Sequence, residues 1–151
     1  MRIIIQRVSQ ASVQVGERLT GAIGSGLMVL LGITHDDTEA DIQWMVKKLL
    51  ALRIFNDDEG KMNKSITEVG GGILVVSQFT LYAQSKKGNR PSYIRSAPPA
   101  ISIPLYERFI AVLRAEFKGQ VETGEFGADM DVVLVNEGPV TILIDSRDPD
   151  F

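Results

Sequence analysis

Hydrophobic and polar positions divide the first third of the chain into short strands separated by turns. Residues 3–5 form an apolar run, residues 13–15 alternate between apolar and polar, and residues 19–23 read as another short strand. Residues 27–31 are continuously apolar, which is typical of a strand covered on both faces. The strongest strand pattern of all covers residues 73–81.

Two helices interrupt these strands. Residues 38–52 carry apolar side chains at helical spacing, with Thr38 as the expected N-cap and acidic residues in the first turn. A second helix is expected over residues 104–117, with Pro104 in its first turn. A polar loop, residues 83–103, precedes it. Two closing strands, 131–135 and 140–145, flank a turn at 136–139.

This order of elements predicts a single α+β domain over residues 1–151. We expect largely antiparallel, curled, barrel-like sheets with two main helices.

Composition removes most familiar catalytic machinery. The 151 residues include no cysteine, which excludes disulfides, thiol catalysis and cysteine-ligated zinc. The single histidine, His35, lies in an acidic turn and is read as a surface or capping residue. The neighbouring acids are read as helix-start charge rather than as a metal site. No HExxH, Walker or GxGxxG pattern occurs in its required context, so we expect no metal and no cofactor. The net charge of −3 argues against a protein that coats nucleic acid, DNA included.

No apolar run approaches the ~18 residues of a membrane span. The apolar run near the N-terminus has three residues, against the ~7–15 of a signal peptide. We therefore expect a cytoplasmic protein that does not bind membranes.

Four segments are candidates for chemistry, and each also has an ordinary structural interpretation. Residues 77–81 follow a buried strand and could be plain strand. Gly138-Pro139 could be a hairpin turn, or, if its peptide bond is cis, a rigid main-chain wall. The basic residues Lys86, Lys87, Arg90 and Arg95 could be a solvated loop or a phosphate-binding patch. Phe126 and Met130 could be core, or could clamp a nucleobase.

Two of these segments, read together, resemble the signatures of the bacterial and eukaryotic D-aminoacyl-tRNA deacylases. They are residues 77–81, Ser-Gln-Phe-Thr-Leu, and residues 136–141, Asn-Glu-Gly-Pro-Val-Thr. Shorter collinear matches support them, at residues 6–8, 11–13, 26–32, 53–55, 60–63, 90–92 and 128–130.

The resemblance implies hydrolysis of D-aminoacyl-tRNA and of achiral glycyl-tRNA at the aminoacylated 3′ end. It implies a homodimer whose active site lies at the subunit interface, where a cis Gly138-Pro139 from one subunit rejects L-amino acids. Arg7 would support that dipeptide. Ser77, Gln78, Phe79 and Thr80 would line the catalytic pocket, and Phe126 and Met130 would lie near the terminal adenosine.

Two other functions fit the residues. The chain could be a non-catalytic RNA-binding module, although its aromatic residues are scattered rather than gathered on one sheet face. It could also hydrolyse small esters or peptides through Ser77 or Thr80, which would require His35 nearby. Whether Thr80 acts as a nucleophile or as a binding and backbone-donor position stays open between these interpretations.

Overall fold

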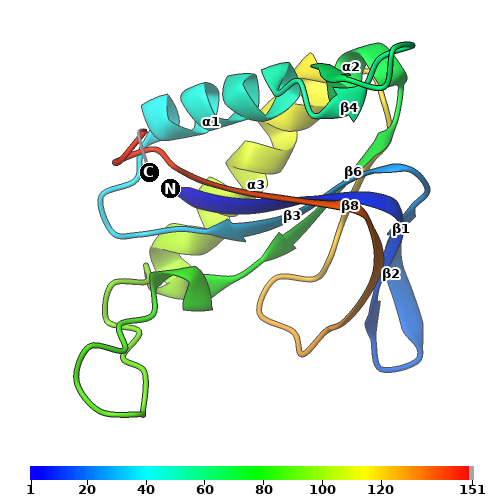
Figure 1. Ribbon diagram of the computed structural model, residues 1–151. Helices are drawn as coiled ribbons and strands as arrows, with labels where there is room; N and C mark the ends of the chain where they lie inside the picture. The colour runs from blue at the N-terminus through cyan, green and yellow to red at the C-terminus, as the bar shows by residue number, and fades with distance from the viewer. Residues whose placement is uncertain (150–151) are drawn as a thin grey trace.

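A long strand, β1 (Arg2–Val15), is paired along both of its edges. Along one edge lies β8 (Asp131–Asp145); along the other lie β3 (Gly26–Gly32) and then β2 (Arg18–Ile23), all antiparallel to β1. The computed structural model describes residues 1–149, and Figure 1 shows β1 beside β3 and β8.

Parallel strands complete the sheet. β6 (Gly72–Ser77) is parallel to β3, and β7 (Val121–Thr123) is parallel to β6. Each parallel connection contains a helix, as parallel pairing requires: α1 (Glu39–Ala51) lies between β3 and β6, and α3 (Pro99–Glu116) between β6 and β7. The expected α+β class and curled, barrel-like sheet are confirmed, but the sheet is mixed rather than largely antiparallel.

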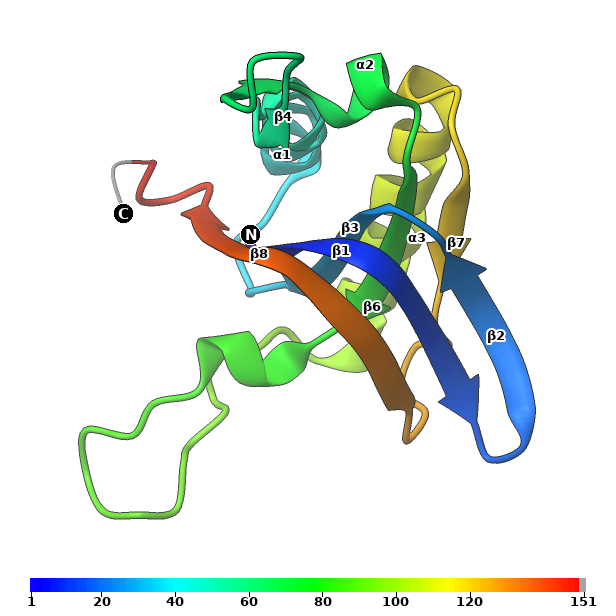
Figure 2. The ribbon, with the colours of Figure 1, turned by 45° about the vertical axis from the view of Figure 1, so that its right-hand side comes forward.

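The sheet has a core on each face. In β3 and β6 the odd-numbered side chains, such as Val29 and Val75, pack with α1 and α3. The even-numbered ones, such as Met28 and Leu74, pack instead with Val13 of β1. This second core is enclosed because β1, β2 and β8 curl away from the helices (Figure 2). Irregularities in the β1–β8 register, on either side of Val8, accompany the bend.

The first predicted helix is confirmed, since α1 follows Thr38 as N-cap and Asp41 completes a capping box. The second begins earlier than expected. Pro98 caps α3 and Pro99 takes its first position, so Pro104 lies inside the helix rather than in its first turn. Smaller elements are β4 (Phe55–Asn56), β5 (Met62–Lys64) and α2 (Ile66–Val69).

Two strand predictions were wrong in extent. The strand expected over 73–81 stops at Ser77, because its partner β3 ends at Gly32, and a 3₁₀ turn, η1 (Phe79–Tyr82), follows. The two closing strands are one strand, β8, whose halves both pair with β1. Residues 136–139 are therefore no hairpin.

Among residues 1–149, no helix is long and apolar enough to cross a membrane.

Candidate active site

A pocket of about 570 Å³ opens where the parallel strands β3 and β6 end. The carboxyl ends of parallel strands are where α/β sheets commonly bind ligands. Ser77, Gln78 and Phe79 line this pocket together with Phe126 and Met130, so two segments about 50 positions apart in the sequence meet there. The lining is mostly apolar, and among residues 1–149 Asp129 is the only charged residue in it.

Residues at the end of β6 and just after it line the pocket. Gln78 N–H still donates to the Leu31 carbonyl at 2.8 Å, which is the last bond to β3. The chain then turns into η1, and the N–H groups of Phe79 and Thr80 fall in its first turn, where helical N–H groups have no partner inside the helix. These two N–H groups lie at the start of η1, beside the pocket-lining residues Gln78 and Phe79.

Thr80 does not line the pocket. Its Oγ1 accepts a hydrogen bond from the Nε2 amide of Gln78. An amide nitrogen does not take up a proton from a hydroxyl, so this contact does not activate Thr80 as a nucleophile. His35 does not line the pocket either. Its Nε2 lies 2.9 Å from the carbonyl oxygen of Ile94.

The opposite wall is a turn between β7 and β8. The ring of Phe126 packs on Tyr106 of α3, with centroids 5.5 Å apart, and burial of the Tyr106 hydroxyl raises its pKa to about 12. Met130 packs on the second core. Both side chains are half-buried, so they belong to the core and to the pocket wall at once.

The segment around Gly138 is a bulge in β8. Gln6 pairs with Thr141 and Val8 with Asn136, so four residues, 137–140, stand opposite the single residue Arg7. The Gly138-Pro139 peptide bond is cis, and both residues are exposed. Neither lines the pocket of its own chain.

The Arg7 side chain is hydrogen-bonded to the main chain of this bulge. It is buried, Nε donates to the Glu137 carbonyl at 3.1 Å, and NH1 donates to the Ile54 carbonyl at 2.7 Å. One guanidinium thus ties the bulge to the segment that follows α1. Neither main-chain partner is recognisable from sequence.

The basic residues of the 83–103 loop lie outside the pocket lining and are all exposed. Figure 2 shows this loop (green) extending away from the sheet. The return of the loop to the pocket brings in residues that sequence reasoning did not select, namely Ser96, Ala97 and Pro99. Their signal in the sequence is weak, because small and proline residues are ordinary in loops.

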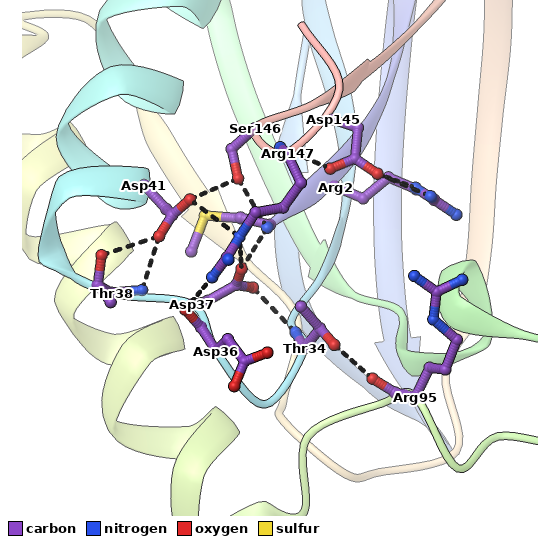
Figure 3. A network of polar contacts seen from close by, with 11 residues as sticks. Arg2, Thr34, Asp36, Asp37, Thr38, Asp41, Arg95, Asp145, Ser146 and Arg147 are labelled. Atoms are coloured by element: carbon purple, nitrogen blue, oxygen red, sulfur yellow. Dashed lines mark hydrogen bonds and ion pairs between the residues drawn. The ribbon is translucent and has the colours of Figure 1, made fainter.

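A polar network joins the amino terminus and residues 145–147 to the start of α1 (Figure 3). The buried α-ammonium of Met1 is paired with Asp37 and also bonds to Ser146 Oγ at 2.8 Å. Burial alone would raise the pKa of Asp41, but hydrogen bonds from Ser146 and Thr38 outweigh it and lower the pKa below its usual value. The sequence predicted that these acids are helix-start charge. This is confirmed for Glu39 and Asp41, which lie in the first turn of α1, but Asp37 is paired with the amino terminus instead.

Arg147 extends the same network, because its Nε lies 3.8 Å from Asp37 and 3.6 Å from Asp41. The tail from residue 147 had no predicted role; residues 150 and 151 of it lie outside the described residues. Within residues 1–149, no three His, Cys, Asp or Glu side chains are grouped so as to hold a metal ion.

Comparison with known proteins places these features in a family. The family model described as D-Tyr-tRNA(Tyr) deacylase matches residues 4–145. The chain belongs to this family. A curated relative from Akkermansia muciniphila, named D-aminoacyl-tRNA deacylase, is 57% identical over 147 residues, covering 97% of this chain and 98% of the relative. One of the same name from Bacteroides fragilis is 56% identical over 150 residues, covering 99% and 100%.

Two solved structures have the same fold. A structure titled c-Myc DNA Unwinding Element Binding Protein is 42% identical, with a TM-score of 0.90 over 96% of this chain and 98% of that one. A structure described as a probable eukaryotic D-amino acid tRNA deacylase is 22% identical, with a TM-score of 0.81 over 95% and 97%, and shows the shared fold.

Proposed function

We propose that the pocket at the end of β6 is the active site of this deacylase-family enzyme, where the ester of D-aminoacyl-tRNA is hydrolysed to free amino acid and tRNA. One observation supports this most strongly. Ser77, Gln78 and Phe79 line a single cavity together with Phe126 and Met130, so the start of η1, whose first N–H groups have no partner inside the helix, adjoins an apolar surface that suits an adenosine.

The chemistry needs little from side chains. An aminoacyl ester is already activated, so hydrolysis requires a positioned water and stabilisation of the oxyanion. The N–H groups of Phe79 and Thr80 would donate to that oxyanion, and loss of one such donor typically costs ~10²–10³ in rate. We assign Thr80 to this backbone role, because its hydroxyl contacts the Gln78 amide rather than a base. No metal or cofactor enters the proposal.

Selection against L-amino acids would come from Gly138 and Pro139. They do not line the pocket of their own chain, so they would act at the pocket of a second copy. Within residues 1–149, β8 pairs along one edge only, and Val133 and Val135 stand 59% and 46% exposed there. This supports a homodimer with a shared site. Glycyl-tRNA would also be hydrolysed, because glycine has no side chain that could clash with Gly138 and Pro139.

The basic residues Lys86, Lys87 and Arg90 would contact phosphates of the tRNA. Since aminoacyl-tRNA is used in the cytoplasm, we place the protein there. The relative whose title names a DNA element raises a second nucleic acid as a candidate ligand. The net charge of −3 argues for a local grip on one tRNA end rather than extended binding to DNA.

The decisive experiment compares D-tyrosyl-tRNA with L-tyrosyl-tRNA, with and without a chelator. We expect rapid loss of the D ester alone, unaffected by the chelator. Equal rates on both esters would refute the chiral sieve, and no hydrolysis of either would favour the RNA-binding module. A DNA duplex added as competitor should leave the rate unchanged. A mass near 16.6 kDa in solution, rather than twice that, would contradict the shared site.

A further inference from the structure

Two exposed aromatic rings stand at the edge of the pocket. Phe79 is 58% exposed and Tyr93 is 39% exposed, and both line the cavity. Their rings meet edge to face, with centroids 5.1 Å apart. Large apolar side chains left this exposed beside a polar loop commonly mark a binding surface.

The segment carrying Tyr93 is exposed, yet it is held firmly in place. Ser92 and Gln84 exchange two backbone hydrogen bonds, at 2.8 and 2.9 Å. Ser96 Oγ donates to the Phe79 carbonyl at 2.7 Å, which joins this segment to η1. Such anchoring positions the aromatic surface before any ligand arrives, which lowers the entropic cost of binding.

A second set of contacts comes from the turn after β3. Thr34 Oγ1 donates to the Arg95 carbonyl at 2.6 Å, and His35 Nε2 lies 2.9 Å from the Ile94 carbonyl. The single histidine of the chain therefore braces the main chain beside Tyr93.

Charge indicates what this surface binds. Between residues 83 and 97 the chain has four cations, Lys86, Lys87, Arg90 and Arg95, and no acid. Proteins that bind single-stranded RNA combine cations along the backbone with aromatic rings on which bases stack. A tRNA enters by its single-stranded 3′ end, so the nucleotide before the terminal adenosine must pass the rim of the pocket.

We propose that Phe79 and Tyr93 form the stacking surface for the base that precedes the terminal adenosine, with Thr34 and His35 as positioning residues for it. This rests on the proposed function and identifies the nucleotide that the rim would recognise. The enzyme would then read two nucleotides, the adenosine inside the pocket and its neighbour at the rim.

Three substrates of increasing length test this in the full-length protein: D-tyrosyl-adenosine, D-tyrosyl-CpA and D-tyrosyl-tRNA. Stacking on one aromatic ring is worth a factor of about 5 to 150 in kcat/KM. We expect Tyr93→Ala to lose a factor in this range on D-tyrosyl-CpA and on the tRNA, mostly through KM, beyond whatever it loses on D-tyrosyl-adenosine, whose rate measures the contribution of Tyr93 to the shape of the pocket. Tyr93→Phe should restore the loss.

Ile94→Ala is the matched control, because Ile94 is the exposed neighbour of Tyr93, at 75% exposure. It should behave as wild type on all three substrates. His35→Ala should show a smaller loss with the same substrate pattern.

Equal losses on all three substrates would overturn the proposal, because Tyr93 would then merely shape the pocket. Unchanged rates on all three would overturn it as well, as would a Tyr93→Ala variant that has become monomeric while the wild type is dimeric. Failure of the wild type on every D ester would instead refute the proposed function.

Discussion

Replacing Gly138 by alanine tests the role of the β8 bulge most directly. The residue has φ of +129°, and an added Cβ would lie 2.9 Å from Val140 Cγ2, 2.9 Å from Val140 N and 3.3 Å from an Arg7 guanidinium nitrogen. The Val140 nitrogen is main chain and cannot rotate aside. The bulge must therefore move, or hold a conformation that L-residues rarely adopt.

The expected size of the effect follows from that geometry. Backbone strain of this kind costs about 1–3 kcal/mol. If the bulge relaxes to avoid it, the population that keeps the active geometry falls by about 5- to 150-fold, at 1.36 kcal/mol for each factor of ten. We expect kcat/KM on D-tyrosyl-tRNA and glycyl-tRNA to fall by such a factor. The global fold should persist, because residues 137–139 are exposed and belong to neither core, and Val140 is a partly buried residue at the margin of the helix-facing core.

Single-turnover deacylation measures this loss, and thermal unfolding measures the stability beside it. Gly16→Ala is the matched control: Gly16 also has positive φ, +58°, but nothing lies within 4 Å of its added Cβ and it belongs to a remote hairpin. It should lose about 1–2 kcal/mol of stability and keep full activity. Wild-type activity in a folded Gly138→Ala protein would show that the bulge takes no part in the reaction.

Three further perturbations probe other parts of the molecule. Arg7→Met leaves the Ile54 carbonyl without its donor, so we expect about 1–3 kcal/mol less stability and a large fall in the rate of deacylation. Arg53→Met, at an exposed position, is the control and should change neither stability nor rate. Equal behaviour of the two variants would contradict the role of Arg7 as an anchor of the bulge. Joint replacement of Lys86, Lys87 and Arg90 by alanine should raise KM for tRNA and flatten its salt dependence by up to about two to three in log–log slope, and an unchanged slope would mean that these cations meet no phosphate. Asp41→Asn should lower the free energy of unfolding by about 1–2 kcal/mol at pH 7. Folding lowers the pKa of Asp41, so this stabilisation is present above about pH 4 and is lost as the pH falls through the folded pKa. Denaturant unfolding at pH 3 should therefore show a smaller difference between variant and wild type, and a difference constant with pH would refute the assignment.

Local patterns predicted the elements whose stability is itself local. The spacing of Ile42, Met45 and Leu49 and the cap at Thr38 identify α1, and the continuous apolar run of β3 correctly indicated burial on both faces. These features depend on neighbours within a few residues. They can therefore be read without knowing the fold.

Features that depend on distant partners escaped prediction. Gly138-Pro139 looks like a hairpin because both residues favour turns, and only pairing of both flanks with β1 shows that β8 continues. Parallel pairing of β3 and β6 is invisible in either strand alone. Pro104 satisfied a first-turn rule, but Pro99 satisfies the same rule five residues earlier.

Some residues of the candidate site could be predicted from the sequence, and others could not. Residues 77–79 with Phe126 and Met130 were selected from sequence and do share a cavity. Thr80 and the cations were selected but lie outside its lining. Tyr93 was not selected, because nothing local in the sequence shows that its ring would meet Phe79.

The two carbonyls held by Arg7 link the bulge to a distant part of the molecule. Ile54 follows α1 and is buried in the helix-facing core, whereas Glu137 adjoins Gly138 at the surface. One planar guanidinium therefore connects the bulge to the buried segment that follows α1. Discrimination between D- and L-aminoacyl esters would then depend partly on core residues that no substrate contacts. A mutation among them would increase hydrolysis of the L ester while leaving the rate on the D ester unchanged.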